Sequence, residues 1–341
     1  MTLRLSSSPL AFFGLLGTVC LGTTAQAGDF LLQWDNDKVV DTDRHYTNGM
    51  RIAYVPNQPT SGLKSLGTLF AEHGAFANPS APRIGWILGQ DMYTPEDVET
   101  TVPDPTDRPY AGWSYVGAFA QDETETGWTG AAQQDTLAVN IGVVGPPSRA
   151  GETQNSFHRL INVAESNGWD SQIGTEPGLL ISRTVKFRSQ PWRPFDQNSA
   201  QIDIVPHATA QLGNIKTAAS VGGTVRVGNN PTNDFGPIYG TFALPHKKAE
   251  RLSWSLFAGA EGRLVVRDIF LDGNTFKNSP NVRRNPLVME SRAGISFHIP
   301  MPQNWGISGL RIDVSHVLRT REFSTQDKSD RYGSFQMTLN F

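Results

Sequence analysis

A polar stretch at residues 34–49 combines side chains that could bind a cation. It contains four aspartates, two asparagines and one histidine, and it lies between two runs in which apolar and polar residues alternate. Carboxylate and amide oxygens gathered at a strand end are ligands for Ca²⁺, whereas Zn²⁺ prefers several His or Cys ligands. Asp, Asn and Gly also build ordinary polar turns. The stretch alone leaves open whether Asp37 holds a calcium ion or belongs to such a turn.

His158 is the best candidate for a general base. Residues 152–167 carry apolar residues at helical spacing, which predicts a helix that ends at Gly168. These apolar residues are Phe157, Leu160, Ile161 and Ala164. Gln154, His158 and Glu165 lie along one flank of that stripe, so the imidazole is expected beside the buried face, where it could activate a water molecule. The structural alternative is a ring satisfied by a loop carbonyl.

Arg108 is the candidate for stabilising negative charge. It lies in the run Asp-Arg-Pro-Tyr-Ala-Gly-Trp at residues 107–113. Its guanidinium could stabilise the oxyanion of an ester hydrolysis, while a cation at Asp37 polarises the carbonyl. Alternatively, Arg108 binds lipopolysaccharide phosphates or a neighbouring carboxylate. The sequence has no serine in a Gly-x-Ser-x-Gly elbow, and its single cysteine is Cys20. Water is therefore the expected nucleophile.

Residues 1–27 are expected to be a secretory signal peptide rather than part of the fold. Arg4 precedes a mostly apolar segment at residues 9–22, and Ala25-Gln26-Ala27 forms a small-x-small cleavage site. Cys20 lies inside this segment, so residues 28–341 would fold without disulfide bonds. The net charge of −3 without a basic cluster argues against nucleic acid as a partner. No later apolar run reaches the ~18 residues of a membrane-spanning helix.

Alternating apolar and polar residues predict that residues 28–341 form one all-β domain, a transmembrane antiparallel β-barrel of about twelve strands. The alternation is clearest before the terminal Phe341, and it is typical of outer-membrane barrels. A secreted β-sandwich is the alternative. The twelve predicted strands are 28–36, 47–55, 84–90, 110–120, 134–145, 177–188, 200–213, 215–228, 251–267, 287–298, 307–320 and 330–341.

This strand order places the candidate residues on one rim. With both termini periplasmic, the connections 37–46, 91–109 and 146–176 are extracellular, and they hold the acidic stretch, Arg108 and the His158 helix. The segment 229–250 becomes a long periplasmic loop after a tight turn near Gly213, which makes the seventh to ninth strands the weakest part of the prediction.

Three blocks of residues resemble the outer-membrane lipid A 3′-O-deacylase family. The first is Asn36-Asp37 followed by Thr-Asp-Arg-His-Tyr-Thr-Asn-Gly at residues 42–49. The second joins Leu-Gly-Gln at 88–90 and Tyr-Thr-Pro at 93–95 to residues 107–112. The third joins Gly-Pro-Pro at 145–147, Gln-Asn-x-x-His at 154–158 and Gly-Trp-Asp at 168–170. Together they cover roughly residues 34–178 in order.

The resemblance implies a calcium-dependent esterase that removes the 3′ acyloxyacyl group of lipid A in the bacterial outer membrane. It implies a site between the outer barrel wall and a helix from an extracellular loop. By motif position, His158 is the general base, and Asn36 and Asp37 are the pair near the cation. Arg108 corresponds to an oxyanion or phosphate contact, and Glu165 to a supporting acid, although a solvated helix charge is the simpler role for Glu165. A passive channel or structural barrel and an outer-membrane phospholipase are the alternative functions.

Overall fold

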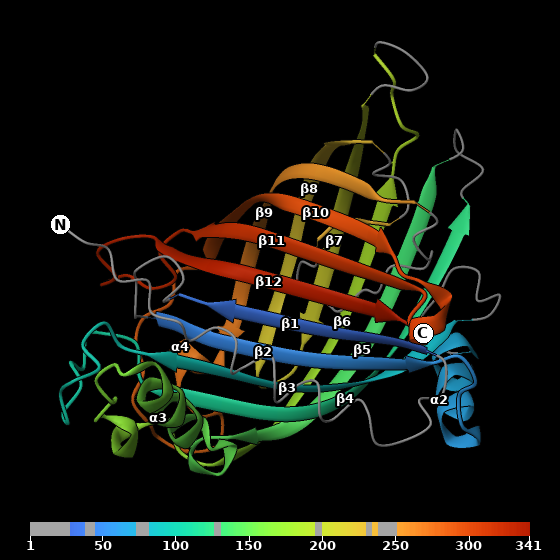
Figure 1. Cartoon of the computed structure of the whole chain (residues 1–341). Coiled ribbons are helices and arrows are strands. Elements are labelled where there is room, and N and C mark those ends of the chain that lie inside the picture. Colours follow the sequence, from blue (N-terminus) through green and yellow to red (C-terminus); the bar gives the residue numbers. More distant parts are fainter. Residues whose placement is uncertain are drawn as a thin grey trace.

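The chain forms a closed barrel of twelve antiparallel strands, in which each strand pairs with the next and the last pairs with the first (Figure 1). The computed structural model describes residues 28–37, 45–72, 82–125, 131–194, 200–229, 234–237 and 251–341. The strands are β1 (Gly28–Asn36), β2 (His45–Pro56), β3 (Arg83–Thr94), β4 (Ala111–Glu125), β5 (Ala132–Val144), β6 (Glu176–Arg188), β7 (Gln201–Leu212), β8 (Lys216–Gly228), β9 (Ser253–Asp268), β10 (Leu287–Pro300), β11 (Gly309–Arg319) and β12 (Asp330–Asn340).

The predicted fold class and strand count are confirmed, and the β-sandwich is excluded because the sheet closes on itself. All twelve segments are strands within a few residues of their predicted bounds. The tight turn between β7 and β8 comprises only residues 213–215, so this region was predicted correctly. The predicted signal peptide and Asp41 and Asp43 lie outside the described residues.

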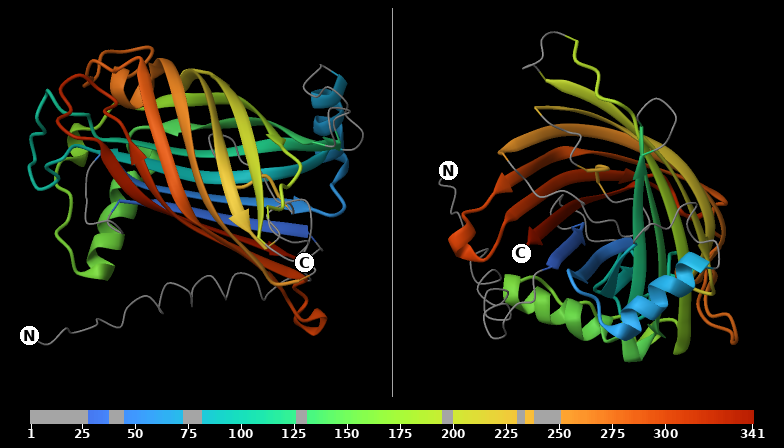
Figure 2. Two further views of the ribbon diagram at one scale, coloured as in Figure 1. Left: turned by 90° about the horizontal axis from the view of Figure 1, so that it is seen from above. Right: turned by 90° about the vertical axis from the view of Figure 1, so that its right-hand side faces the viewer.

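Short helices lie at the two rims of the barrel. They are α2 (Ser61–Glu72), α3 (Ala150–Ile161), α4 (Ile269–Asp272) and the 3₁₀ turns η2 (Pro146–Ser148), η3 (Trp169–Ser171) and η5 (Gln303–Trp305). Figure 2 shows α2 and α3 outside the barrel wall, at opposite ends. Among the described helices, none combines the length and apolar character that a membrane-spanning helix needs.

The two faces of the wall differ in the way that a lipid environment requires. Large apolar side chains such as Leu88, Val116 and Ile141 point outward and are more than half exposed. Their neighbours on the inward face include charged residues that are buried, such as Asp91 and Glu290. Because successive strand residues point to opposite faces, the sequence alternation produces an apolar outside and a polar lumen.

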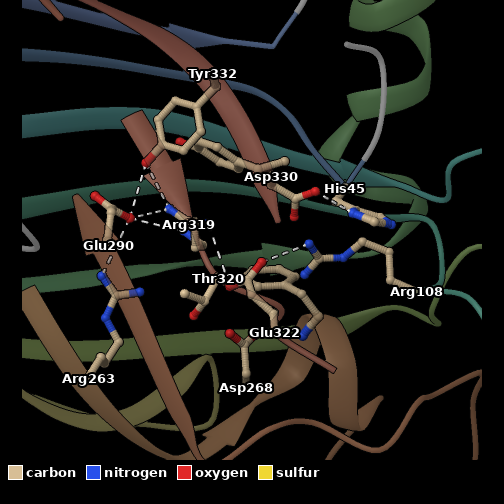
Figure 3. A network of polar contacts seen from close by, with 12 residues as sticks. His45, Arg108, Arg263, Asp268, Glu290, Arg319, Thr320, Glu322, Asp330 and Tyr332 are labelled. Atoms are coloured by element: carbon tan, nitrogen blue, oxygen red, sulfur yellow. Dashed lines mark hydrogen bonds and ion pairs between the residues drawn. The ribbon is translucent and has the colours of Figure 1, made fainter. Parts of the chain in front are cut away.

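Ion pairs fill the lumen. Near the rim that carries α3, Arg319 contacts Glu290 at 2.8 Å and Glu322 at 3.6 Å (Figure 3). Toward the other rim, Asp234 accepts from Arg311 at 2.6 Å and also pairs with Arg226. Asp234 belongs to the connection after β8, so part of the predicted long loop folds into the lumen.

Candidate functional site

A cavity of about 490 Å³ lies between the outward face of β1–β3 and the helix α3. It brings together Asn36 at the end of β1 and His158 on α3, which are 122 positions apart in the sequence. The predicted meeting of the first and third sequence blocks is therefore observed. The lining residues are Trp34, Asn36, Thr47, Asn48, Met50, Gln90, Met92, Arg149, Glu152, Thr153, Gln154, Ser156, Phe157, His158 and Leu160.

The start of α3 is fastened to the barrel wall through Ser148. Its carbonyl accepts hydrogen bonds from Gln90 Nε2 at 2.8 Å and from Ser114 Oγ at 2.7 Å. Gly112 allows this close approach, because a Cβ there would overlap both Ser148 and Ala150. The glycine that ends the second sequence block thus permits the helix of the third block to dock.

Aromatic contacts hold the rest of the loop against the wall. The Trp34 ring on β1 meets the Phe157 ring on α3 edge to face, with centroids 6.3 Å apart. Tyr110 packs against Trp169 at 5.0 Å, and Trp169 Nε1 donates to Gln154 Oε1 at 2.7 Å. These contacts fix both the height and the rotation of α3 over the cavity.

His158 is oriented by a backbone carbonyl. Its Nδ1 lies 2.6 Å from the oxygen of Ala164, and the side chain is almost wholly buried. A carbonyl oxygen can only accept, so Nδ1 carries the hydrogen and Nε2 of the neutral ring keeps its lone pair. The carbonyl contact, considered above as a structural alternative, therefore also produces the tautomer that a general base needs.

Glu165 does not take the position expected of it. The helix ends at Ile161, where Asn162 adopts a left-handed conformation with φ 58°, and not at Gly168. Glu165 therefore lies beyond the helix, exposed, and its carboxylate accepts from Arg159 at 2.8 Å. Ala164, one residue earlier, supplies the oxygen that contacts His158, so Glu165 has no described contact with the histidine.

Arg108 is also placed elsewhere. Its side chain is fully buried in the lumen, 3.1 Å from Glu322 (Figure 3). Its guanidinium also lies 4.7 Å from the centre of the Tyr93 ring. Arg108 is not among the residues that line the cavity. Of the alternatives for Arg108, the structure shows the contact with a neighbouring carboxylate, that of Glu322. Glu322 belongs to the connection between β11 and β12, and sequence spacing could not place this connection next to Arg108.

The ends of β1 and β2 supply the oxygens that could hold calcium. Asn36 Nδ2 donates to the carbonyl of Thr47 at 3.2 Å, whereas its buried Oδ1 has no hydrogen-bond partner among the described residues. Asp37 follows directly and is 1% exposed, but it is not among the residues that line the cavity. The described residues contain no cluster of three or more His, Cys, Asp or Glu side chains at metal-binding spacing. A cation here would need amide, backbone, water or substrate oxygens in addition, which calcium accepts.

The sequence analysis assigned no role in the site to Trp34 or Asn48, which lie in the polar stretch, or to Arg149, although all three line the cavity. Trp34 and Asn48 are joined by a hydrogen bond of 2.7 Å from the indole to the amide oxygen. Arg149 is the arginine that lines the cavity. Its position two residues after the Gly-Pro-Pro segment is the one sequence signal that could have identified it as a site residue. The role of Ala164 rests on its backbone, for which its side chain provides no signal.

Comparison with known structures supports the fold. LpxR from Salmonella typhimurium superposes with a TM-score of 0.72 at 21% identity, over 92% of this chain and 100% of that chain. The translocator domain of the autotransporter NalP from Neisseria meningitidis covers 97% of this chain and 96% of that chain at 9% identity, with a TM-score of only 0.45. Comparison with curated protein sequences finds no match.

The family model described as outer membrane protein LpxR matches residues 10–341. This match confirms both the resemblance drawn from the three sequence blocks and the bacterial outer membrane as the location. The chain therefore belongs to the LpxR family of outer membrane proteins, the lipid A 3′-O-deacylase family.

Proposed function

We propose that the chain hydrolyses the 3′-linked acyloxyacyl ester of lipid A with the help of calcium, and that His158 activates the attacking water. The observation that carries the proposal is the cavity itself. It combines a buried histidine in the base tautomer with the Asn36 amide, and it lies on the outer side of the wall where a lipid would arrive.

In this mechanism, Nε2 of His158 accepts a proton from water as the water oxygen attacks the ester carbonyl carbon. The tetrahedral intermediate then collapses and the bond between the carbonyl carbon and the sugar oxygen breaks. The protonated imidazole returns its proton to the departing 3′ oxygen, which leaves a free hydroxyl on the sugar and a released carboxylic acid. The Ala164 carbonyl keeps the same tautomer through the cycle and stabilises the imidazolium.

Asn36 and Asp37 are the residues that would hold calcium. The buried Oδ1 of Asn36 and the buried carboxylate of Asp37 fit an oxygen-binding cation. When bound, calcium supplies a Lewis acid that stabilises negative charge on the ester oxygen. Arg108 cannot provide this stabilisation from its position in the lumen, because it does not reach the cavity.

The lipid would enter sideways from the outer leaflet. On the same wall, an apolar hollow of about 670 Å³ is lined by residues such as Ile52, Leu88 and Val116. Ile52 and Leu88 lie two positions from the cavity residues Met50 and Gln90 on β2 and β3, so they share the outward face. The hollow offers room for acyl chains beside the ester.

The test compares the lipid A mass of cells that express the wild-type chain, His158→Gln or His316→Gln. The wild-type chain should remove the 3′ acyloxyacyl mass, and His158→Gln should reduce the rate by about 10²–10⁴-fold because general base catalysis is lost. His316 is an exposed residue on β11, so its variant serves as the matched control. Full activity in a folded His158→Gln barrel would overturn the mechanism.

Two other functions make different predictions. A passive channel requires an open lumen, whereas the described lumen contains buried ion pairs such as that of Arg319 with Glu290. Steady conductance in planar bilayers without lipid A hydrolysis would favour it. A phospholipase would release fatty acid from glycerophospholipids, which chromatography of both lipid classes distinguishes.

A further inference from the structure

Arg149 brings a positive charge to the cavity at a position that the proposed mechanism leaves unused. Its side chain is exposed, and the residues that line the cavity include no other arginine and no lysine. The cavity also contains Glu152, but no ion pair joins Glu152 to Arg149 within the described part of the chain. Arg149 is therefore available to an anionic ligand.

The backbone holds Arg149 firmly while leaving its side chain in the cavity. The residue adopts the left-handed conformation with φ 55° and ψ 27°, which is costly for a residue other than Gly, Asn or Asp. Its N–H donates to Pro146 O at 3.0 Å, and its carbonyl accepts from the N–H and the hydroxyl of Thr153, each at 3.0 Å. These three hydrogen bonds fix the Cα at the point where η2 passes into α3.

The distance to His158 suits a sugar phosphate. His158 lies nine positions after Arg149, which is roughly 13 Å along a helix axis. Side chains on a helix lean toward its N-terminus, so the His158 ring leans toward Arg149. Lipid A is a disaccharide with phosphates at its 1 and 4′ positions, and the 4′ phosphate is on the carbon next to the 3′ ester. A sugar bound at His158 would place a phosphate within the space that the long arginine side chain can reach.

We propose that Arg149 binds a phosphate of lipid A and thereby orients the disaccharide so that its 3′ ester meets His158. The planar guanidinium matches two phosphate oxygens at once, which gives direction as well as attraction. This inference rests on the proposed deacylase function. It assigns to Arg149 the phosphate contact that the sequence suggested for Arg108.

The experiment measures kcat/KM for four substrates with four forms of the purified barrel in detergent. The substrates are bisphosphorylated lipid A, its 1-dephosphorylated and 4′-dephosphorylated forms, and the form without either phosphate. The proteins are the wild-type chain, Arg149→Asn, Arg149→Lys and Arg159→Gln. Asn tolerates the left-handed conformation, so Arg149→Asn removes the charge without straining the turn. Arg159 is on α3, which begins directly after Arg149, but it lies outside the cavity and is the matched control.

Arg149→Asn should lower kcat/KM for bisphosphorylated lipid A by about tenfold or more, mainly through KM, because the contact forms when the substrate binds. The loss should disappear for the substrate that lacks the contacted phosphate, which identifies it as the 1 or the 4′ group. Arg149→Lys should retain most of the activity, and Arg159→Gln all of it.

An equal loss on all four substrates, or no loss on the bisphosphorylated one, would overturn the role of Arg149. Failure of the wild-type chain to deacylate any substrate would instead contradict the proposed function. Heat-modifiable migration of each variant on gels confirms that the barrel has folded.

Discussion

At the scale of the residue, the proposed chemistry depends on one carbonyl. The contact of His158 Nδ1 with Ala164 O fixes which nitrogen is free, so in the proposed mechanism a backbone atom takes the place of the acidic side chain found in many hydrolases. Asn36 shows the complementary situation, because its Nδ2 is satisfied by Thr47 O while its buried Oδ1 has no hydrogen-bond partner in the part of the chain that the structure describes. An oriented and unsatisfied oxygen is suited to a cation.

Replacing Asn36 with Ala should weaken calcium binding by about tenfold or more, because a hydrogen-bonding group that faces a charge contributes on the order of 1.5–3 kcal/mol. Isothermal titration of the detergent-solubilised barrel with calcium measures this directly, and the calcium concentration for half-maximal deacylation should rise in parallel. Asn281→Ala, in an exposed loop, is the control. Unchanged calcium affinity in Asn36→Ala would remove Asn36 from the ligand set.

At the scale of the element, α3 forms one side of the cavity only because it docks on the barrel wall. The helix is short, and isolated helices of about twelve residues are marginal in water. Its position comes from Ser148, bonded to β3 and β4, and from the ring contact of Phe157 with Trp34. The cavity is therefore a property of docking and not of the helix alone.

Gly112→Val tests this docking. The new side chain would overlap Ser148 and Ala150 and displace the start of α3 from the wall. We expect deacylation to fall by about a hundredfold or more, because small displacements of positioned groups have effects of that size. Gly262→Ala on β9, where an added Cβ meets no atom within 4 Å, should keep full activity. Wild-type activity in a folded Gly112→Val barrel would show that α3 docking is dispensable.

At the scale of the whole molecule, the lumen and the outer wall have separate tasks. The lumen contains buried ion pairs between distant strands and loops, including that of Arg108 with Glu322. The outer wall carries the cavity and the apolar hollow. An enzyme that takes its substrate from the membrane needs no passage through the barrel, so these charges can serve stability alone.

Glu322→Gln should destabilise the barrel by roughly 3–5 kcal/mol, because it leaves the buried Arg108 without its counter-charge. The double variant Arg108→Met with Glu322→Gln should recover much of that loss. The midpoint of denaturant-induced unfolding in detergent measures both. If the unfolding midpoint of Glu322→Gln equals that of the wild-type chain, the ion pair of Arg108 with Glu322 does not stabilise the barrel.

The same pair predicts a pH dependence. Burial alone would raise the pKa of Glu322, but Arg319 and Arg108 outweigh it and hold the pKa well below its usual value. A carboxyl group whose pKa is lowered by folding stabilises the fold fully at pH values above its pKa in the unfolded state, which is about 4.3 for Glu. This contribution is lost as the pH falls from there toward the pKa in the folded state. The stability difference between the wild-type chain and Glu322→Gln should therefore narrow below about pH 4.

The strand pattern was predictable from sequence because it is local. The period of two in the alternation determines which residues face lipid, and hydrocarbon tolerates no open sheet edge, so twelve such segments imply a closed barrel. The same reasoning placed Asn36 and His158 on one rim. The end of α3 was predicted wrongly, because Asn162 can adopt the left-handed conformation and stop the helix before Gly168.

By itself, the amino-acid sequence determined the barrel, its rim and the pair Asn36 and His158, since strand alternation and short motifs are encoded in neighbouring residues. Only the tertiary structure decided which charges reach the cavity. Arg108 is held in the lumen by Glu322, Glu165 lies outside beside Arg159, and Arg149 lines the cavity. These placements depend on contacts between segments far apart in the chain, which residue spacing cannot specify.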